Sequence, residues 1–319
     1  MSPRRTAAVV ALVLPAALGL GACSSDPSDG RLQVLASFYP LQLVAQEVGG
    51  DVVDVSSLTP PGAEPHDIEL SPAQVSRVST SDLVVYLSGF QAAVDDAVAQ
   101  TDPEHVVDAA DHVDLLTLAQ EHAHDEHADE DLGGDDAHDE HDHGDLDPHF
   151  WLDPSRMPAV TGAVADALTA VSPEHGDEFR ARADALSARF TELDARYESG
   201  LAVCERDVIV TAHAAFGYLA DRYGLEQVGI SGLDPEAEPS PARLTAVAKV
   251  VRDEQVTTIF FESLVSPKVA QTLADDLGID AAVLDPIESI SESALAAGED
   301  YFTVADANLD ALRVALSCS

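Results

Sequence analysis

Short runs rich in β-branched residues alternate with amphipathic stretches along most of the chain. In the first half, the predicted strands span residues 32–38, 51–58, 82–87 and 105–110. The helices predicted between them begin near Pro40, Ser71 and Phe90. Ser71 precedes a proline and stands three residues before Gln74, the pattern of an N-cap with a capping box.

The second half repeats this alternation. Its predicted strands span residues 207–212, 256–261 and 281–285. Its predicted helices begin near Ala214, Ser240 and Ser266, and a last helix covers residues 304–316. Strand, helix and strand at this spacing favour an α/β fold with a parallel sheet and right-handed crossovers in each half.

A long helix is predicted between the two halves, over residues 173–203. Its apolar positions recur every three or four residues, at Phe179, Ala183, Leu186, Phe190, Leu193, Tyr197 and Leu201. Neither Pro nor Gly occurs from Asp177 to Ser199. We therefore expect a stiff helix that joins two lobes; the alternative is a homodimeric coiled coil, although the stripe lasts for only about three heptads.

The amino terminus has the features of an export signal. Arg4 and Arg5 precede an apolar run that is short and contains Pro and Gly, and small residues follow it. Residues 20–23, Leu-Gly-Ala-Cys, resemble the bacterial lipoprotein box, in which the cysteine becomes the lipidated first residue. This resemblance implies a signal peptide over residues 1–22 and a lipid anchor on Cys23; the alternative is an ordinary signal peptide ending near a chance cysteine.

Cys204 and Cys318 are the two other cysteines of the chain. An exported chain would place them in an oxidising compartment, where two thiols usually pair. We therefore predict a disulfide between them, with two buried free thiols as the alternative.

The charge balance excludes some partners. The chain of 319 residues has 16 Lys and Arg against 58 Asp and Glu, a formal net charge of −42. Nucleic acids and anionic lipid surfaces need a cationic face, so no nucleic-acid partner is expected. A hydrophobic fraction of 46% argues against global disorder.

Residues 121–147 concentrate much of this acidity beside histidine. The segment lacks apolar periodicity, Lys and Arg, and we expect it to be a disordered loop inserted in the first lobe. Its histidines, proposed as weak metal ligands, are His122, His124, His127, His138, His141 and His143. The loop could serve as a spacer, as a weak Zn²⁺ collector, or as a sensor or storage element.

Candidate metal ligands stand outside this loop, next to predicted strands or turns. His66 lies beyond one strand, His213 directly follows another, and His149 stands between two Asp-Pro pairs. Asp285 ends the strand predicted at residues 281–285, and ligands of α/β proteins usually bind at the carboxyl ends of strands. Three imidazoles and one carboxylate would form a tetrahedral set suited to Zn²⁺. Asp67, Glu262 and Asp153 are candidates to orient the imidazoles.

Several segments resemble the metal-binding solute-binding proteins of bacterial ABC transporters, in particular the zinc-specific branch. They are GAEPHDIELSP, DPHFWLDP, TAHAAFGYLADRYGL, EPSPARL and FESLVSPK. The resemblance implies two (β/α)4 lobes with parallel sheets, joined by a rigid helix, with a metal cleft between them. It also implies Zn²⁺ held by His66, His149, His213 and Asp285, with Glu64 as an alternative contact.

The resulting domain prediction assigns residues 23–172 to the first lobe and 204–319 to the second, with the linking helix at 173–203. The predicted protein is an extracytoplasmic, lipid-anchored monomer, in a periplasm or at a cell surface, that delivers Zn²⁺ to an ABC permease. The alternatives are a zinc buffer or chaperone without a transporter, a manganese-binding homologue, and a secreted zinc hydrolase. An enzyme is not expected, because HExxH, GxSxG and a Cys/His nucleophile pair are absent from the sequence.

Overall fold

The computed structural model describes residues 30–117 and 146–319. Arg31–Ser319 form one compact unit that contains both sheets. The lipidation candidate Cys23 and the six histidines of the acidic segment lie outside the described residues. No helix in the described ranges is long and apolar enough to cross a membrane. The residue boundaries of the two lobes stay a prediction.

The first half forms a parallel sheet with strand order β2-β1-β3-β4. Its strands and helices are β1 Leu32–Ala36, α1 Tyr39–Gly49, β2 Val53–Ser57, α2 Pro72–Thr80, β3 Leu83–Tyr86, α3 Ala92–Thr101, β4 Val106–Asp108 and α5 Met157–Val171. Short 3₁₀ helices cover Gly50–Val52 (η1), Ala109–Asp111 (η2) and Phe150–Leu152 (η5). The capping box predicted at Ser71 is confirmed at the start of α2. Helix α5 was not among the helices predicted from the sequence.

The second half forms a parallel sheet with strand order β6-β5-β7-β8. Its elements are β5 Val208–Thr211, α7 Gly217–Tyr223, β6 Glu226–Gly229, α8 Pro241–Asp253, β7 Thr258–Phe261, α9 Lys268–Leu277, β8 Asp280–Val283, α10 Glu292–Ala296 and α11 Tyr301–Leu316. The prediction of two parallel four-stranded sheets is therefore confirmed.

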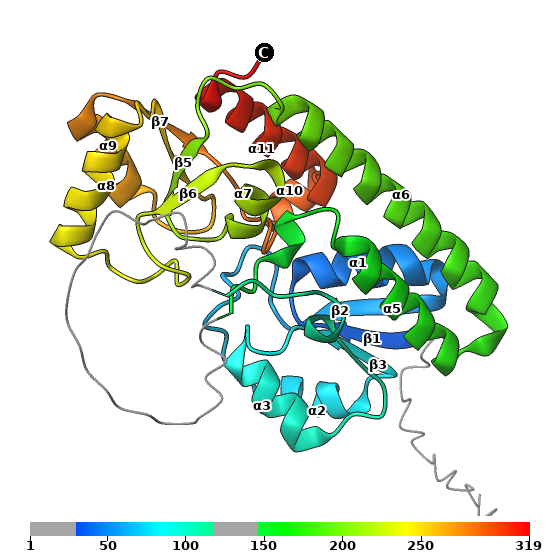
Figure 1. Ribbon diagram of the computed structural model, residues 1–319. Coiled ribbons are helices and arrows are strands. Elements are labelled where there is room, and N and C mark those ends of the chain that lie inside the picture. Colours follow the sequence, from blue (N-terminus) through cyan, green and yellow to red (C-terminus); the bar gives the residue numbers. More distant parts are fainter. Residues whose placement is uncertain (1–29, 118–145) are drawn as a thin grey trace, which may run out of the picture. The chain divides into compact units, whose positions relative to one another are not determined.

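The long helix is α6, Gly176–Leu201, which follows a 3₁₀ turn at Pro173–His175 (η6). All seven residues of its predicted apolar stripe are buried. Helices α1 and α5 of the first half and α11 of the second contact α6 (Figure 1). The stripe is thus covered by helices of the same chain, which leaves no apolar seam for the coiled-coil alternative.

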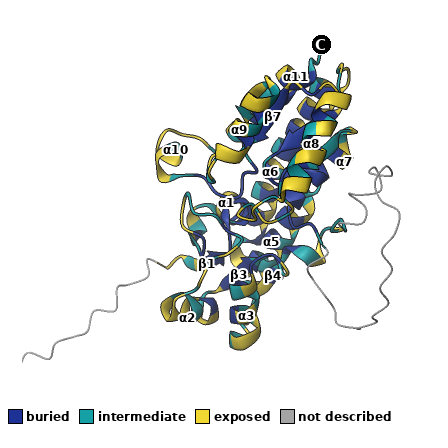
Figure 2. Cartoon of the chain, turned by 90° about the vertical axis from the view of Figure 1, so that its left-hand side faces the viewer, coloured by how far each residue is buried: buried dark blue, intermediate teal, exposed yellow. Residues whose placement is uncertain are grey.

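One continuous core joins the two halves through α6. It contains Val34 and Trp151 from the first half, Phe190 from α6, and Tyr218 and Leu312 from the second half. Buried segments run through the interior, whereas the outward surfaces of α8, α9 and α10 are exposed (Figure 2). Ionic contacts add to this packing, because Arg189 of α6 contacts both Glu47 of α1 and Asp300 before α11.

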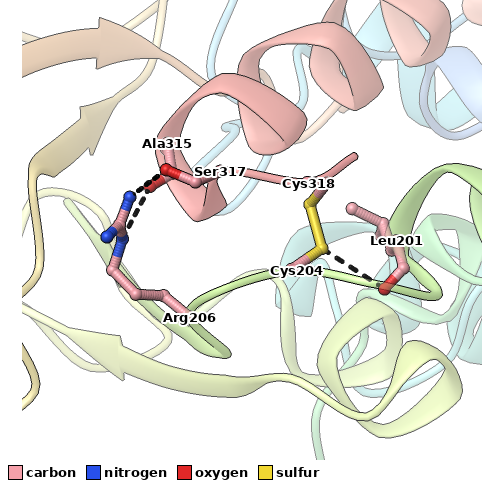
Figure 3. Close-up of a disulfide and its surroundings, with 6 residues drawn as sticks. All are labelled: Leu201, Cys204, Arg206, Ala315, Ser317 and Cys318. Atoms are coloured by element: carbon pink, nitrogen blue, oxygen red, sulfur yellow. Dashed lines mark hydrogen bonds between the residues drawn. A yellow bond between two sulfur atoms is a disulfide. The ribbon is translucent and has the colours of Figure 1, made fainter.

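Cys204 and Cys318 form the predicted disulfide (Figure 3). The bond links the chain just after α6 to the chain just after α11. Arg206 supports the same junction, because its Nε donates to the Ala315 carbonyl at 3.2 Å and its guanidinium also contacts Ser317. The C-terminal helix is therefore held covalently and by hydrogen bonds.

Replacing both Cys204 and Cys318 by Ser should lower the free energy of unfolding by about 2–5 kcal/mol, because the bond closes a long loop in the unfolded chain. Chemical denaturation of the variant and of the oxidised and reduced wild-type protein would measure this. Unchanged denaturation midpoints in both comparisons would contradict the prediction.

Candidate metal centre

The carboxyl ends of the strands supply most of the site, since His66 follows β2, His213 follows β5 and Glu262 follows β7. His149 instead occupies the N-cap position of η5. His149 and His213 are buried and His66 is partly buried. The structure thus brings together three histidines that are far apart in the sequence.

Glu288 completes this group. Within the described ranges, the residues that gather in metal-binding geometry are His66, His149, His213 and Glu288, with ligand atoms all within 4.8 Å of one another. Glu288 Oε1 lies 3.4 Å from His66 Nε2, 3.0 Å from His149 Nε2 and 3.6 Å from His213 Nε2. Three Nε2 atoms and one carboxylate oxygen therefore surround one small volume.

Carboxylates orient two of the imidazoles from behind. His149 Nδ1 lies 2.6 Å from Asp147 Oδ1, and His213 Nδ1 contacts Glu262 Oε1. Within the described part of the chain, the buried Nε2 atoms of His149 and His213 make no aligned hydrogen bond, although Glu288 Oε1 lies 3.0 and 3.6 Å away as an ionic neighbour. A carboxylate on Nδ1 fixes the ring and leaves Nε2 as the electron-pair donor, the arrangement typical of metal-ligating histidine.

The third imidazole is held differently. The His66 ring packs edge-on against Phe90, with ring centroids 4.8 Å apart. The Glu64 carboxylate accepts from the His66 backbone N–H at 3.0 and 3.1 Å, and Glu64 Oε1 lies 3.9 Å from His66 Nε2. Glu64 therefore borders the group, and burial raises its pKa.

These surroundings determine the charges of the group. Burial lowers the pKa of His149, but the carboxylates of Asp147 and Glu288 together outweigh burial and raise that pKa to about 10. For His213, burial is likewise outweighed, here by Glu262 and Glu288, and the pKa rises to about 9. Burial works against the charge of Glu288, yet its three histidine neighbours hold its pKa well below the usual range. Without a metal, His149 and His213 are therefore imidazolium ions at neutral pH, next to the ionised Glu288 carboxylate.

Asp285, predicted as the fourth ligand, lies outside this group. Its carboxylate contacts Ser263 Oγ and accepts from the Ile287 backbone N–H at 2.8 Å. The turn that follows places Glu288 among the imidazoles instead. Glu288 belongs to the same VLDPIES segment, but the sequence carries no signal that favours it over Asp285, because the positive φ of Ile287 decides which carboxylate faces the imidazoles.

Of the three residues predicted to orient the imidazoles, Glu262 alone contacts one of the three metal-site histidines in the described structure. Asp67 is exposed, and Asp153 accepts from Ser155 and Arg156 rather than from a histidine. Asp147 was missed because it was assigned to the loop at 121–147. Its position two residues before His149 is that of an Asx turn, in which it accepts from the His149 N–H at 2.9 Å.

The last two residues of the loop predicted at 121–147 do not belong to a disordered segment. Leu146 forms an antiparallel bridge with Thr117, and Asp147 is fully buried. Tyr218 of α7 donates to the Asp147 carbonyl at 2.8 Å and accepts from the Leu116 N–H at 2.7 Å. Leu146 and Asp147 therefore belong to the ordered site, while residues 118–145 lie outside the described residues.

Contacts between the two halves connect the loops that carry these ligands. The Gly62 N–H donates to Ser289 Oγ at 2.8 Å, which links the His66 loop to the Glu288 turn. Trp151 Nε1 donates to the Pro286 carbonyl at 2.7 Å, which links η5 to the same turn. The relative positions of His66, His149 and Glu288 are therefore fixed by direct hydrogen bonds.

Comparisons with known proteins agree with this site. Residues 34–315 match the family model ZnuA, described as zinc-uptake complex component A, periplasmic. The chain is 36% identical to the zinc-binding lipoprotein AdcA of Streptococcus pneumoniae over 299 residues, which cover 93% of this chain but 58% of AdcA. It is 32% identical to the high-affinity zinc uptake system protein ZnuA of Bacillus subtilis, covering 92% of this chain and 90% of that protein.

Solved structures extend the similarity to three dimensions. The crystal structure of the Zn(II)-bound ZnuA-like domain of Streptococcus pneumoniae AdcA matches with a TM-score of 0.74 at 32% identity. The match covers 90% of this chain and 99% of that domain. The chain spans little more than half the length of full AdcA. The family model, the relatives and the shared fold together show that this chain belongs to the ZnuA family of zinc-uptake solute-binding proteins.

Proposed function

We propose that this protein captures Zn²⁺ outside the cytoplasm and delivers it to an ABC permease. The observation that carries the proposal is the pair of buried Nε2 atoms of His149 and His213, which face Glu288 and make no aligned hydrogen bond within the described part of the chain. Burying such atoms without a hydrogen bond is costly, and a metal ion would satisfy both. The printed names of the relatives, zinc-binding lipoprotein and zinc uptake protein, support the same cargo.

The donor set favours Zn²⁺ over Mn²⁺. Three imidazole nitrogens and one carboxylate oxygen match the tetrahedral preference of zinc, whereas manganese prefers more oxygen ligands. Four protein ligands leave no position for an activated water, which suits a carrier rather than a hydrolase. A zinc buffer without a transporter would share this site and differ only in its partner, so an adjacent ATPase and permease in the genome would distinguish the two functions.

We further propose that the protein is a monomer anchored to the membrane through a lipid on Cys23. The lipoprotein box carries this proposal, and AdcA, the relative described as a lipoprotein, supports it. Mass spectrometry of the membrane-extracted protein would find a lipid on Cys23, and replacing Cys23 by Ala would release the protein.

Metal analysis of protein purified without added metal tests the proposed cargo. We expect one tightly bound Zn²⁺ per chain, and its loss in His66→Ala and His213→Ala variants. Retained tight zinc in both variants would contradict the proposed ligands, and a preference for Mn²⁺ in competition would contradict the proposed cargo.

The affinity for Zn²⁺ should rise with pH. Zinc must displace protons from His149 and His213, whose pKa values near 10 and 9 keep both rings protonated at neutral pH. Apparent affinity should increase about tenfold per pH unit for each proton displaced, up to about pH 9. Competition with a chromophoric chelator at pH 6, 7 and 8 would measure it, and a flat profile would contradict these pKa values.

The metal-free protein should show the opposite trend in stability. Both pKa values are raised above the unfolded value of about 6.5, so their contribution is full below that pH. It is lost as the pH rises through 9 and 10. Denaturation of the metal-free protein across this range provides a control for the binding profile.

The acidic, histidine-rich segment is proposed as a weak Zn²⁺ collector. Its six histidines lie outside the described residues, and the composition of the segment supports this role. Deleting residues 121–145 keeps Asp147 in place and should leave one tight site while removing the weak ones. Calorimetric titration would measure both classes, and unchanged stoichiometry would count against the collector.

A further inference from the structure

The turn that presents Glu288 contains an unfavourable backbone conformation. Ile287 has a φ of 57°, in the left-handed region that β-branched residues rarely adopt. Ile287 and Glu288 are both buried, each with an exposed fraction of 1%. A conformation of this kind persists only when the surrounding contacts impose it.

Asp285 supplies the contact nearest to this residue. Its Oδ1 accepts from the Ile287 N–H at 2.8 Å, closing an Asx turn around Pro286. The Asp285 backbone is itself fixed to α11, because its N–H donates to Asn308 Oδ1 at 2.9 Å and its carbonyl accepts from Asn308 Nδ2 at 2.7 Å. Because the Asp285 backbone is fixed, the hydrogen bond from its side chain also fixes the position of the Ile287 N–H.

The other carboxylate oxygen of Asp285 connects the turn to a second part of the site. Ser263 Oγ donates to Asp285 Oδ2, and Ser263 directly follows Glu262. Glu262 contacts His213 Nδ1, while Glu288 faces Nε2 of the same ring. One carboxylate therefore ties together the segments that approach His213 from both sides.

One side of the turn at residues 285–288 faces a pocket and not packed side chains. A cavity of about 650 Å³ borders Ser263, Asp285, Ser289 and Asn308. Atoms that face this space have no packed protein neighbour there, and the contacts of Asp285 with Ser263 and Ile287 hold the turn on that side.

We propose that Asp285 is a positioning residue that places the Glu288 carboxylate among the three imidazoles. This inference rests on the proposed zinc site and deepens it, since it assigns a role to a residue that does not contact the cargo. Asn can replace Asp285 in this role, because its Oδ1 accepts from Ile287 and its Nδ2 can donate to Ser263.

The test compares Asp285→Ala, Asp285→Asn and Asp280→Ala. Asp280 is exposed at the other end of β8, so Asp280→Ala removes the same negative charge as Asp285→Ala without altering the turn. Asp285→Ala should lower Zn²⁺ affinity about 10- to 100-fold, the range for residues that orient ligands. Asp285→Asn should restore affinity, and Asp280→Ala should leave it unchanged. The visible spectrum of the Co²⁺-loaded protein should change with Asp285→Ala alone, because it reports the ligand geometry.

Unchanged affinity and Co²⁺ spectrum in Asp285→Ala would overturn the inference. Equal losses in Asp285→Asn and Asp285→Ala would also overturn it, because the effect would then come from the charge or from direct ligation. Thermal unfolding of each metal-free variant separates misfolding from misplacement, and Ser263→Ala, which should lower affinity in the same direction, provides a milder second variant. Failure of the unaltered protein to bind Zn²⁺ would overturn the proposed function and the inference with it.

Discussion

Replacing Glu288 by Gln is expected to lower the affinity for Zn²⁺ by about 100-fold or more. Structural zinc sites with four ligands are worth about 10–16 kcal/mol, so one ligand accounts for about 3 kcal/mol, or roughly a factor of 100 in affinity. Glu288 is also the one carboxylate within 4 Å of all three Nε2 atoms in the described structure. The amide keeps the shape of the side chain but removes its negative charge.

Competition titration against a chelator of known affinity would measure this loss. Glu292→Gln provides a matched control, because Glu292 is exposed four residues away and undergoes the same charge change. Wild-type affinity in Glu288→Gln would exclude Glu288 as the anionic ligand and leave Asp285 and Glu64 as the candidate carboxylates.

Replacing His149 by Ala should have a larger effect, on both binding and folding. The change removes one ligand and also leaves Asp147 and Glu288 buried without their imidazolium partner. Breaking a buried ion pair from one side typically costs about 3–5 kcal/mol. We therefore expect a loss of tight zinc binding together with a clear decrease in the free energy of unfolding.

Calorimetric zinc titration and chemical denaturation of the metal-free protein measure the two effects separately. His112→Ala is the control, because His112 is exposed and lies outside the metal group. A His149→Ala variant that binds Zn²⁺ as tightly as the wild type, or unfolds at the same denaturant concentration, would contradict this account of the site.

Periodic packing explains which elements could be predicted from the sequence. The apolar stripe of α6 follows from the helical repeat, and every residue of it is buried as expected. Strand β6, Glu226–Gly229, was missed because its EQVG sequence is mostly polar and has no apolar run. It is defined instead by parallel pairing with β5, which is a tertiary contact. Helix α11 begins at Tyr301, three residues before the predicted start, because Asp300 and Thr303 form a capping box.

The sequence around each candidate explains which residues of the site could be predicted. The three histidines could be selected because each stands beside a strand or a turn, and the structure brings all three together. The choice between Asp285 and Glu288 depends on the conformation of Ile287, which no sequence pattern specifies. The role of Asp147 similarly depends on the burial of its side chain beside His149.

Crystallography of the zinc-loaded protein, with anomalous diffraction at the zinc edge, tests the central claim most directly. The account predicts one strong peak about 2.0–2.2 Å from Nε2 of His66, His149 and His213 and from a Glu288 carboxylate oxygen. A peak elsewhere in the protein, or a fourth ligand supplied by Asp285 instead of Glu288, would contradict it.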